Sequence, residues 1–201
     1  MEKNLEKLFA DEIADIYDAE QQILKALPKM IKAASASELQ EALEQHRTVT
    51  EGQVQRLERI FQELGEHPKK KCKGMAGLLA EGEEMIDEDL PDNVKDAGLI
   101  GAAQKVEHYE MAAYGTARTL AEFLGNEMAV DLLQQTLDEE KEADELLSQI
   151  AETCVNVDAT SESGEDEEEE SEEGEGTPSR RTARAPARAK ATAARRKTTR
   201  K

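Results

Sequence analysis

The chain has 201 residues and a formal net charge of −19, with 45 acidic against 26 basic side chains. Residues 1–154 carry nearly all of this charge, which argues against nucleic-acid binding by that part of the chain; a solvated surface, attraction of cations and adaptation to high salt all remain open as reasons for it. Two cysteines without CxxC spacing predict no disulfide framework. The sequence has no secretory apolar segment and no membrane-spanning stretch, so we expect a cytoplasmic protein without membrane association.

Four long helices and one short helix are predicted, because apolar residues recur at steps of three and four. In chain order the long helices span about residues 4–33, 37–65, 94–124 and 127–154, and the short helix spans about 75–87. Short breaks make neighbouring helices antiparallel, whereas the connection 66–93 is long enough to cross the bundle. The second and third long helices are therefore expected to run parallel. Pro28 is expected to kink or loosen the first helix.

Ligand-type side chains interrupt the apolar stripe of each long helix near its middle. An unpaired carboxylate in a protein interior costs several kcal/mol, and no Lys or Arg lies at the centre of a stripe. Oxygen ligands with one imidazole suit Fe(II), Mn(II) or, less specifically, Zn(II), and carboxylates can bridge two ions. Two metal ions are favoured over a cluster of proton-sharing acids. The interrupting residues, in chain order, are Glu20, His46, Glu107, Glu110, Glu140 and Asp144.

Each of these residues also has a plainer interpretation. A glutamate one position out of phase, such as Glu20, would place its carboxylate in solvent, and the same holds for Asp144. His46 alone is more often a hydrogen-bonded core histidine than a metal ligand. The metal hypothesis depends on six such residues occurring at matching depth in four helices.

The domain boundaries follow from composition. Residues 1–156 are predicted to form the bundle, 157–178 an acidic disordered linker and 179–201 a basic disordered tail, because neither block has enough apolar surface to offset chain entropy. No aromatics accompany the basic residues, so binding to DNA or another polyanion would use phosphate contacts and depend on salt. Pairing with the acidic run is the alternative. The tail cations are Arg180, Arg181, Arg184, Arg188, Lys190, Arg195, Arg196, Lys197, Arg200 and Lys201.

Several segments resemble the ferritin-like YciE/YciF stress-protein family. They are DAEQQ at 18–22, HRTVT at 46–50, QVQRL at 53–57, AQKVEHYE at 103–110, YGT at 114–116 and LDEEK at 137–141. The resemblance covers about residues 4–154. It implies an all-α, ferritin-like four-helix bundle that is commonly a homodimer, with a dinuclear iron or manganese site like that of rubrerythrins.

By position, the resemblance makes Glu20, Glu107, Glu110 and Glu140 metal ligands. Two Glu-x-x-His motifs of the wider di-iron pattern are altered. Residues 43–46 read LEQH and lack the glutamate, and residues 140–143 read EKEA and lack the histidine. Asp144 is one position beyond the absent histidine and is expected to replace it.

Two tyrosines are candidate hydrogen-bond donors to the ligands, with core packing as the alternative for each. Tyr17 precedes Glu20 by three residues, and Tyr114 follows Glu110 by four. Three functions remain open: a di-metal protein with ferroxidase or peroxidase-like activity, a non-catalytic dimeric scaffold, and a polyanion-associated protein that uses its tail.

Overall fold

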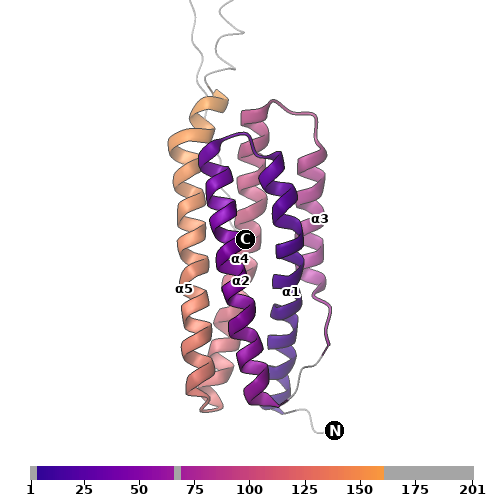
Figure 1. Ribbon diagram of the computed structural model, residues 1–201, viewed down its shortest axis with the longest axis vertical. Coiled ribbons are helices and arrows are strands. Elements are labelled where there is room, and N and C mark those ends of the chain that lie inside the picture. Colours follow the sequence, from indigo (N-terminus) through magenta and orange to yellow (C-terminus); the bar gives the residue numbers. More distant parts are fainter. Residues whose placement is uncertain (1–3, 66–68, 161–201) are drawn as a thin grey trace, which may run out of the picture.

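A computed structural model describes residues 4–65 and 69–160, and every regular element in them is a helix (Figure 1). The predicted acidic and basic segments beyond residue 160 lie outside the described residues. Residues 157–160, expected to begin the linker, are helical. The backbone also stays helical through Pro28, within the first element. The elements are α1 (Leu5–Ala33), α2 (Ser37–Leu64), α3 (Lys73–Asp87), α4 (Asp92–Phe123), α5 (Glu127–Ile150) and a π-helical turn (Ala151–Val155).

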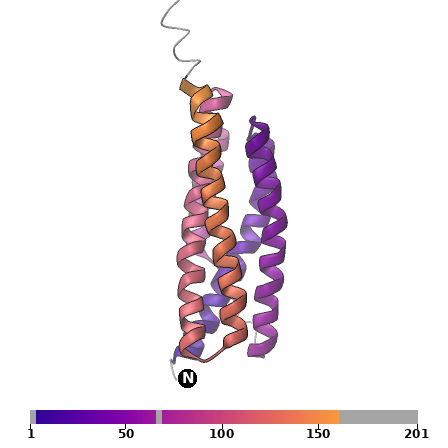
Figure 2. The same cartoon turned by 90° about the vertical axis from the view of Figure 1, so that its left-hand side faces the viewer.

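The four long helices form a bundle in which a long crossover connects α2 to α4. The helices α1 and α5 run in one direction, and α2 and α4 run in the other, so the predicted parallel pair is confirmed (Figures 1 and 2). The short helix α3 lies in the crossover and packs on α1 and α4. This up-down-down-up order is the ferritin-like arrangement that the sequence predicted, and it brings one face of each long helix to the bundle axis.

Two glycines end helices where the chain reverses. Gly65 has φ +67° after α2, and Gly125 has φ +72° between α4 and α5. Both are in the left-handed region, which glycine adopts without a steric penalty. Asn126 then starts α5, because its side chain accepts a hydrogen bond from Ala129 N at 2.9 Å. The predicted breaks at Gly65 and at Gly125–Asn126 are therefore confirmed.

The core consists of two apolar clusters, one toward each end of the bundle. Each long helix contributes to both, and the switch from one to the other occurs where the sequence turns polar. In α1, for example, Ile16 belongs to one cluster and Ile23 to the other, with the fully buried Glu20 between them. In α5, Leu133 and Leu147 flank the fully buried Glu140 in the same way. A layer of buried polar groups therefore lies between two apolar halves.

One buried carboxylate outside this layer is structural. Asp96 of α4 is 1% exposed and accepts hydrogen bonds from Ser35 N at 2.9 Å, Ser35 Oγ at 2.6 Å and Ala36 N at 2.7 Å. Ala36 precedes α2 and has no side chain able to cap that helix. Asp96 thus satisfies from another helix the amide groups that the α1–α2 turn leaves free.

Replacing Asp96 with alanine is expected to lower the free energy of unfolding by about 2–4 kcal/mol, because three donors lose a buried charged acceptor. Urea denaturation followed by circular dichroism measures the loss. Asp89→Ala is the matched control, since Asp89 is exposed in the loop before α4 and the variant removes the same charge. Equal effects of the two variants would contradict the capping role.

Candidate metal centre

Four of the six predicted ligands come together at the middle of the bundle. His46 of α2, Glu107 and Glu110 of α4 and Glu140 of α5 each present one ligand atom, and these atoms all lie within 4.8 Å of one another. The three glutamates are at most 3% exposed, and the His46 side chain is 11% exposed. His46 Nε2 lies 3.5 Å from Glu107 Oε1. Residues 107 and 110 share a face because they are three apart on one helix.

Glu20 of α1 completes the polar layer from the side facing Glu110. Its side chain is fully buried, and Tyr114 Oη donates a hydrogen bond to its Oε1. Its carboxyl group also lies close to that of Glu110. Glu110 thus belongs to the group of four and also lies close to Glu20. Of the two predicted tyrosine donors, Tyr114 contacts a predicted ligand.

Five carboxylate oxygens of this cluster are buried without any hydrogen-bond partner. They are Glu20 Oε2, Glu107 Oε2, both oxygens of Glu110 and Glu140 Oε2. Buried polar atoms are almost always paired in proteins, because an unpaired one loses its hydration without compensation. A bound cation would give these unpaired oxygens a partner. Carboxylate oxygens with one imidazole are ligands that iron and manganese accept, so the residues present fit a metal centre.

Burial dominates the electrostatics of the cluster. Burial, followed by repulsion from Glu140, raises the pKa of Glu20 to about 8, and burial also raises the pKa of Glu107 to about 8. The pKa values of Glu110 and Glu140 are well above the ordinary value for the same reason. Burial lowers the pKa of His46 to about 4, so its imidazole is neutral at pH 7 and has a lone pair available for a metal.

Polar residues that the sequence did not assign hold the carboxylates in place. Gln53 is 1% exposed and donates from Nε2 both to Glu140 Oε1 and, at 3.2 Å, to Glu139 Oε2. Arg56 pairs with Glu139 and donates from Nε to Thr136 Oγ1 at 2.9 Å. The sequence contained a signal for Gln53, because this residue follows His46 by seven positions and so lies on the same face of α2. Arg56 lies beside that face and was missed.

Asp144 and Tyr17 point elsewhere. Asp144 Oδ1 accepts from Gln104 Nε2 at 3.2 Å and lies 3.3 Å from His108 Nε2, and Asp144 is not among the four clustered residues. Tyr17 Oη donates to Glu58 at 3.3 Å, and its ring packs edge-on against Phe61. None of these partners is a predicted ligand.

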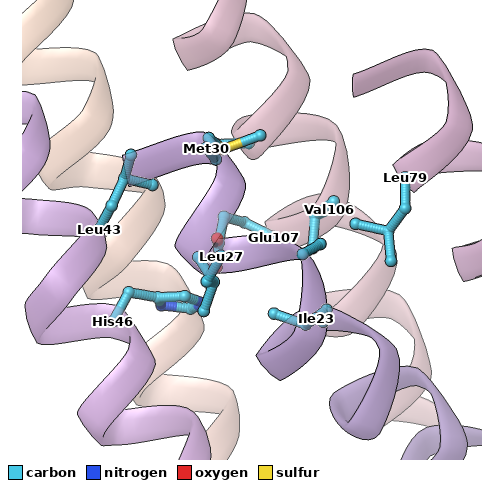
Figure 3. Close-up of a pocket in the computed structure, with 10 residues that line it drawn as sticks. Ile23, Leu27, Met30, Leu43, His46, Leu79, Val106 and Glu107 are labelled. Carbon is cyan, nitrogen blue, oxygen red and sulfur yellow. Dashed lines mark ion pairs between the residues drawn. The ribbon is translucent and has the colours of Figure 1, made fainter. Parts of the chain in front are cut away.

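A small apolar cavity of about 30 Å³ borders the cluster on the side of α1 and α3 (Figure 3). His46 and Glu107 contribute the polar part of its wall. The rest is hydrocarbon and thioether from residues such as Leu27, Met30 and Val106. The cluster is thus shielded from water on this side.

Comparison with known proteins agrees with the fold. The family model described as a domain of unknown function (DUF892) matches residues 4–160. Protein YciF of Escherichia coli (strain K12) is 41% identical over 163 residues, which are 80% of this chain and 98% of that protein. The crystal structure of that E. coli stress protein superposes with a TM-score of 0.75, covering 77% of this chain and 99% of the other.

Two further solved structures extend the comparison. YcfI from Rhodopseudomonas palustris is 41% identical, has a TM-score of 0.71, and the match covers 73% of this chain and 94% of that one. A protein from Xanthomonas campestris pv. campestris shares the fold at 20% identity and a TM-score of 0.66, covering 80% and 99% of the two chains.

Fold and site together define a ferritin-like helical protein with a carboxylate–histidine cluster in its core. The chain belongs to the DUF892 family, and its relative in E. coli is the stress protein YciF, as the resemblance predicted. Among the described residues, no helix is long and apolar enough to cross a membrane.

Proposed function

We propose that this chain is a stress-response protein whose cluster holds two transition-metal ions, iron or manganese, and acts on Fe(II) or peroxide. The observation that carries the proposal is the group of five buried carboxylate oxygens without partners, gathered beside the neutral His46. Divalent cations offset the charge of such a group without requiring each carboxyl to take up a proton. The E. coli relative is described as a stress protein, which supports the physiological part of the proposal.

His46, Glu107, Glu110 and Glu140 would hold bound metal as one group, and Glu20 would add a carboxylate beside Glu110. Iron or manganese bound there supplies redox chemistry. The chain's own groups orient the ligands: Tyr114 holds Glu20, and Gln53 holds Glu140. With one imidazole and without Asp144, this set of residues would leave coordination positions open for a small reactant.

Metal content tests the proposal. Full-length protein purified without chelator is expected to contain two iron or manganese ions per chain by elemental analysis. Glu107→Ala/Glu110→Ala is expected to lose both ions, and His46→Ala to lose one. His108→Ala is the matched control for His46→Ala, because His108 is a surface histidine on α4 outside the group of four. A metal-free wild type that also fails to bind added Fe(II) or Mn(II) would contradict the proposal.

Turnover separates catalysis from a scaffold role. Loaded wild type is expected to oxidise Fe(II) or consume peroxide, and Glu107→Ala/Glu110→Ala is expected to lose that activity. Full loading without turnover would instead support a non-catalytic dimeric scaffold. The basic residues 180–201 lie outside the described residues, so polyanion binding stays a sequence-based prediction.

A further inference from the structure

A second cavity opens on the opposite side of His46, between α2 and α5. Its volume is about 240 Å³, much larger than that of the apolar cavity. These two helices pack side by side along the bundle (Figure 2). The α2–α5 groove, as we name this cavity, is lined by Ala42, Gln45, His46, Val49, Glu139, Glu142, Ala143 and Leu146. It therefore reaches a member of the metal cluster directly.

Carboxylates of decreasing exposure line the way from this groove to the cluster. Glu142 is exposed, the Glu139 side chain is 25% exposed, and Glu140 is fully buried. The first two are three residues apart on α5 and share its groove face. A cation moving inward along these residues exchanges water for carboxylate oxygen in steps, which avoids one large loss of hydration.

Gln53 links the groove to the buried site. Its amide nitrogen donates to both Glu139 and Glu140, so the Gln53 side chain bridges these two carboxylates. Gln53 Oε1 and Glu140 Oε2 are buried and have no hydrogen-bond partner. Arg56 pairs with Glu139 and fixes it at the inner end of the groove. These unpartnered oxygens, and not the acidic residues alone, point to a cation as the species that passes.

The apolar cavity offers no comparable route. Apart from His46 and Glu107, its walls are aliphatic and thioether groups (Figure 3). Moving a divalent ion through such surroundings costs many kcal/mol. The α2–α5 groove and the apolar cavity thus lie on opposite sides of His46.

We propose that the α2–α5 groove is the path by which hydrated divalent cations reach the cluster, with Glu142 and Glu139 as transient ligands. This inference rests on the proposed metal site and adds its route of loading. Because Glu139 and Glu142 act only in transit, they control the rate of loading and leave the final number of bound ions unchanged.

Stopped-flow mixing of the metal-free, full-length protein with Co(II) tests the route, with a metallochromic dye reporting free Co(II). Glu139→Gln and Glu142→Gln are each expected to slow association, by about tenfold together, while elemental analysis at equilibrium shows the wild-type number of ions. Ala143→Leu, which fills the groove without changing charge, is also expected to slow association. The rate should fall as ionic strength rises, because the carboxylates near the mouth are partly exposed.

Two control variants isolate the route. Glu145→Gln removes the same charge from an exposed position of α5 outside the groove, and Ala26→Leu fills the apolar cavity. Both are expected to load at the wild-type rate. Wild-type rates in Glu142→Gln and Ala143→Leu would overturn the route while the metal site stands. A reduced number of ions in Glu139→Gln would make it a permanent ligand and overturn its transit role. No Co(II) binding by wild type would instead refute the proposed function.

Discussion

Replacing Glu107 with glutamine is expected to stabilise the metal-free protein and to weaken the metal-loaded one. At pH 7 the buried Glu107, with its pKa raised to about 8, must take up a proton when the metal-free chain folds. That proton uptake costs on the order of 3 kcal/mol, and an amide of nearly the same shape does not incur it. With metal present the order reverses, because glutamine is a poor ligand for a hard cation.

The measurement is urea denaturation at pH 7 in chelator and again in excess Mn(II). Wild type is expected to gain about 4 kcal/mol on binding when Mn(II) is at 1,000 times its dissociation constant, and Glu107→Gln is expected to gain much less. Glu145→Gln, on the exposed face of α5, should match wild type in both conditions. If Glu107→Gln were less stable than wild type both in chelator and in Mn(II), the substitution would have damaged the core. That result would contradict the predicted reversal of the order of stability.

In chelator, the free energy of unfolding is expected to fall as the pH rises from about 5 to about 8. Glu20 and Glu107 have folded-state pKa values of about 8, against an ordinary glutamate pKa of 4.5. Across that interval the folded state holds protons that the unfolded chain has released, so raising the pH favours unfolding. Each full proton contributes a slope of about 1.4 kcal/mol per pH unit.

His46 acts in the opposite direction on the acid side. The pKa of His46 is about 4 in the folded state, against an ordinary histidine pKa of 6.5. The stability that comes from keeping this imidazole neutral is therefore lost as the pH falls through that interval. Because two carboxyl groups oppose one imidazole, the decline with rising pH outweighs the His46 effect above about pH 4, and the metal-free protein should be most stable near that pH.

Thermal unfolding in chelator across pH 4 to 9 measures this profile. Excess Mn(II) should flatten its alkaline side, because bound metal keeps the carboxylates ionised in the folded state. Glu20→Gln/Glu107→Gln should have a shallower alkaline slope than wild type without any metal. An alkaline slope unchanged in that variant would show that these two groups do not cause the decline.

The helices and the depth of the polar layer were predictable from the sequence. Both follow from local periodicity, since each helix carries its own apolar stripe and its own interruption. Glu107 and Glu110 were assigned together because three residues return to the same face of a helix. Gly65 and Gly125 likewise marked the turns through backbone preferences that need no partner.

Contacts between helices were decided by the tertiary structure. Asp144 follows Glu140 by four residues and shares its phase, yet it lies about 6 Å further along the axis and meets Gln104 and His108 of α4. The phase of one helix does not specify its height relative to the next helix.

The sequence by itself therefore determined an all-helical bundle with buried carboxylates at its middle, because helical period and burial are properties of single segments. Only the tertiary structure decided which carboxylates meet, that Gln53 joins Glu140 to Glu139, and that a groove beside His46 opens between α2 and α5. These features depend on the rotation, height and spacing of neighbouring helices, which packing of the whole core sets.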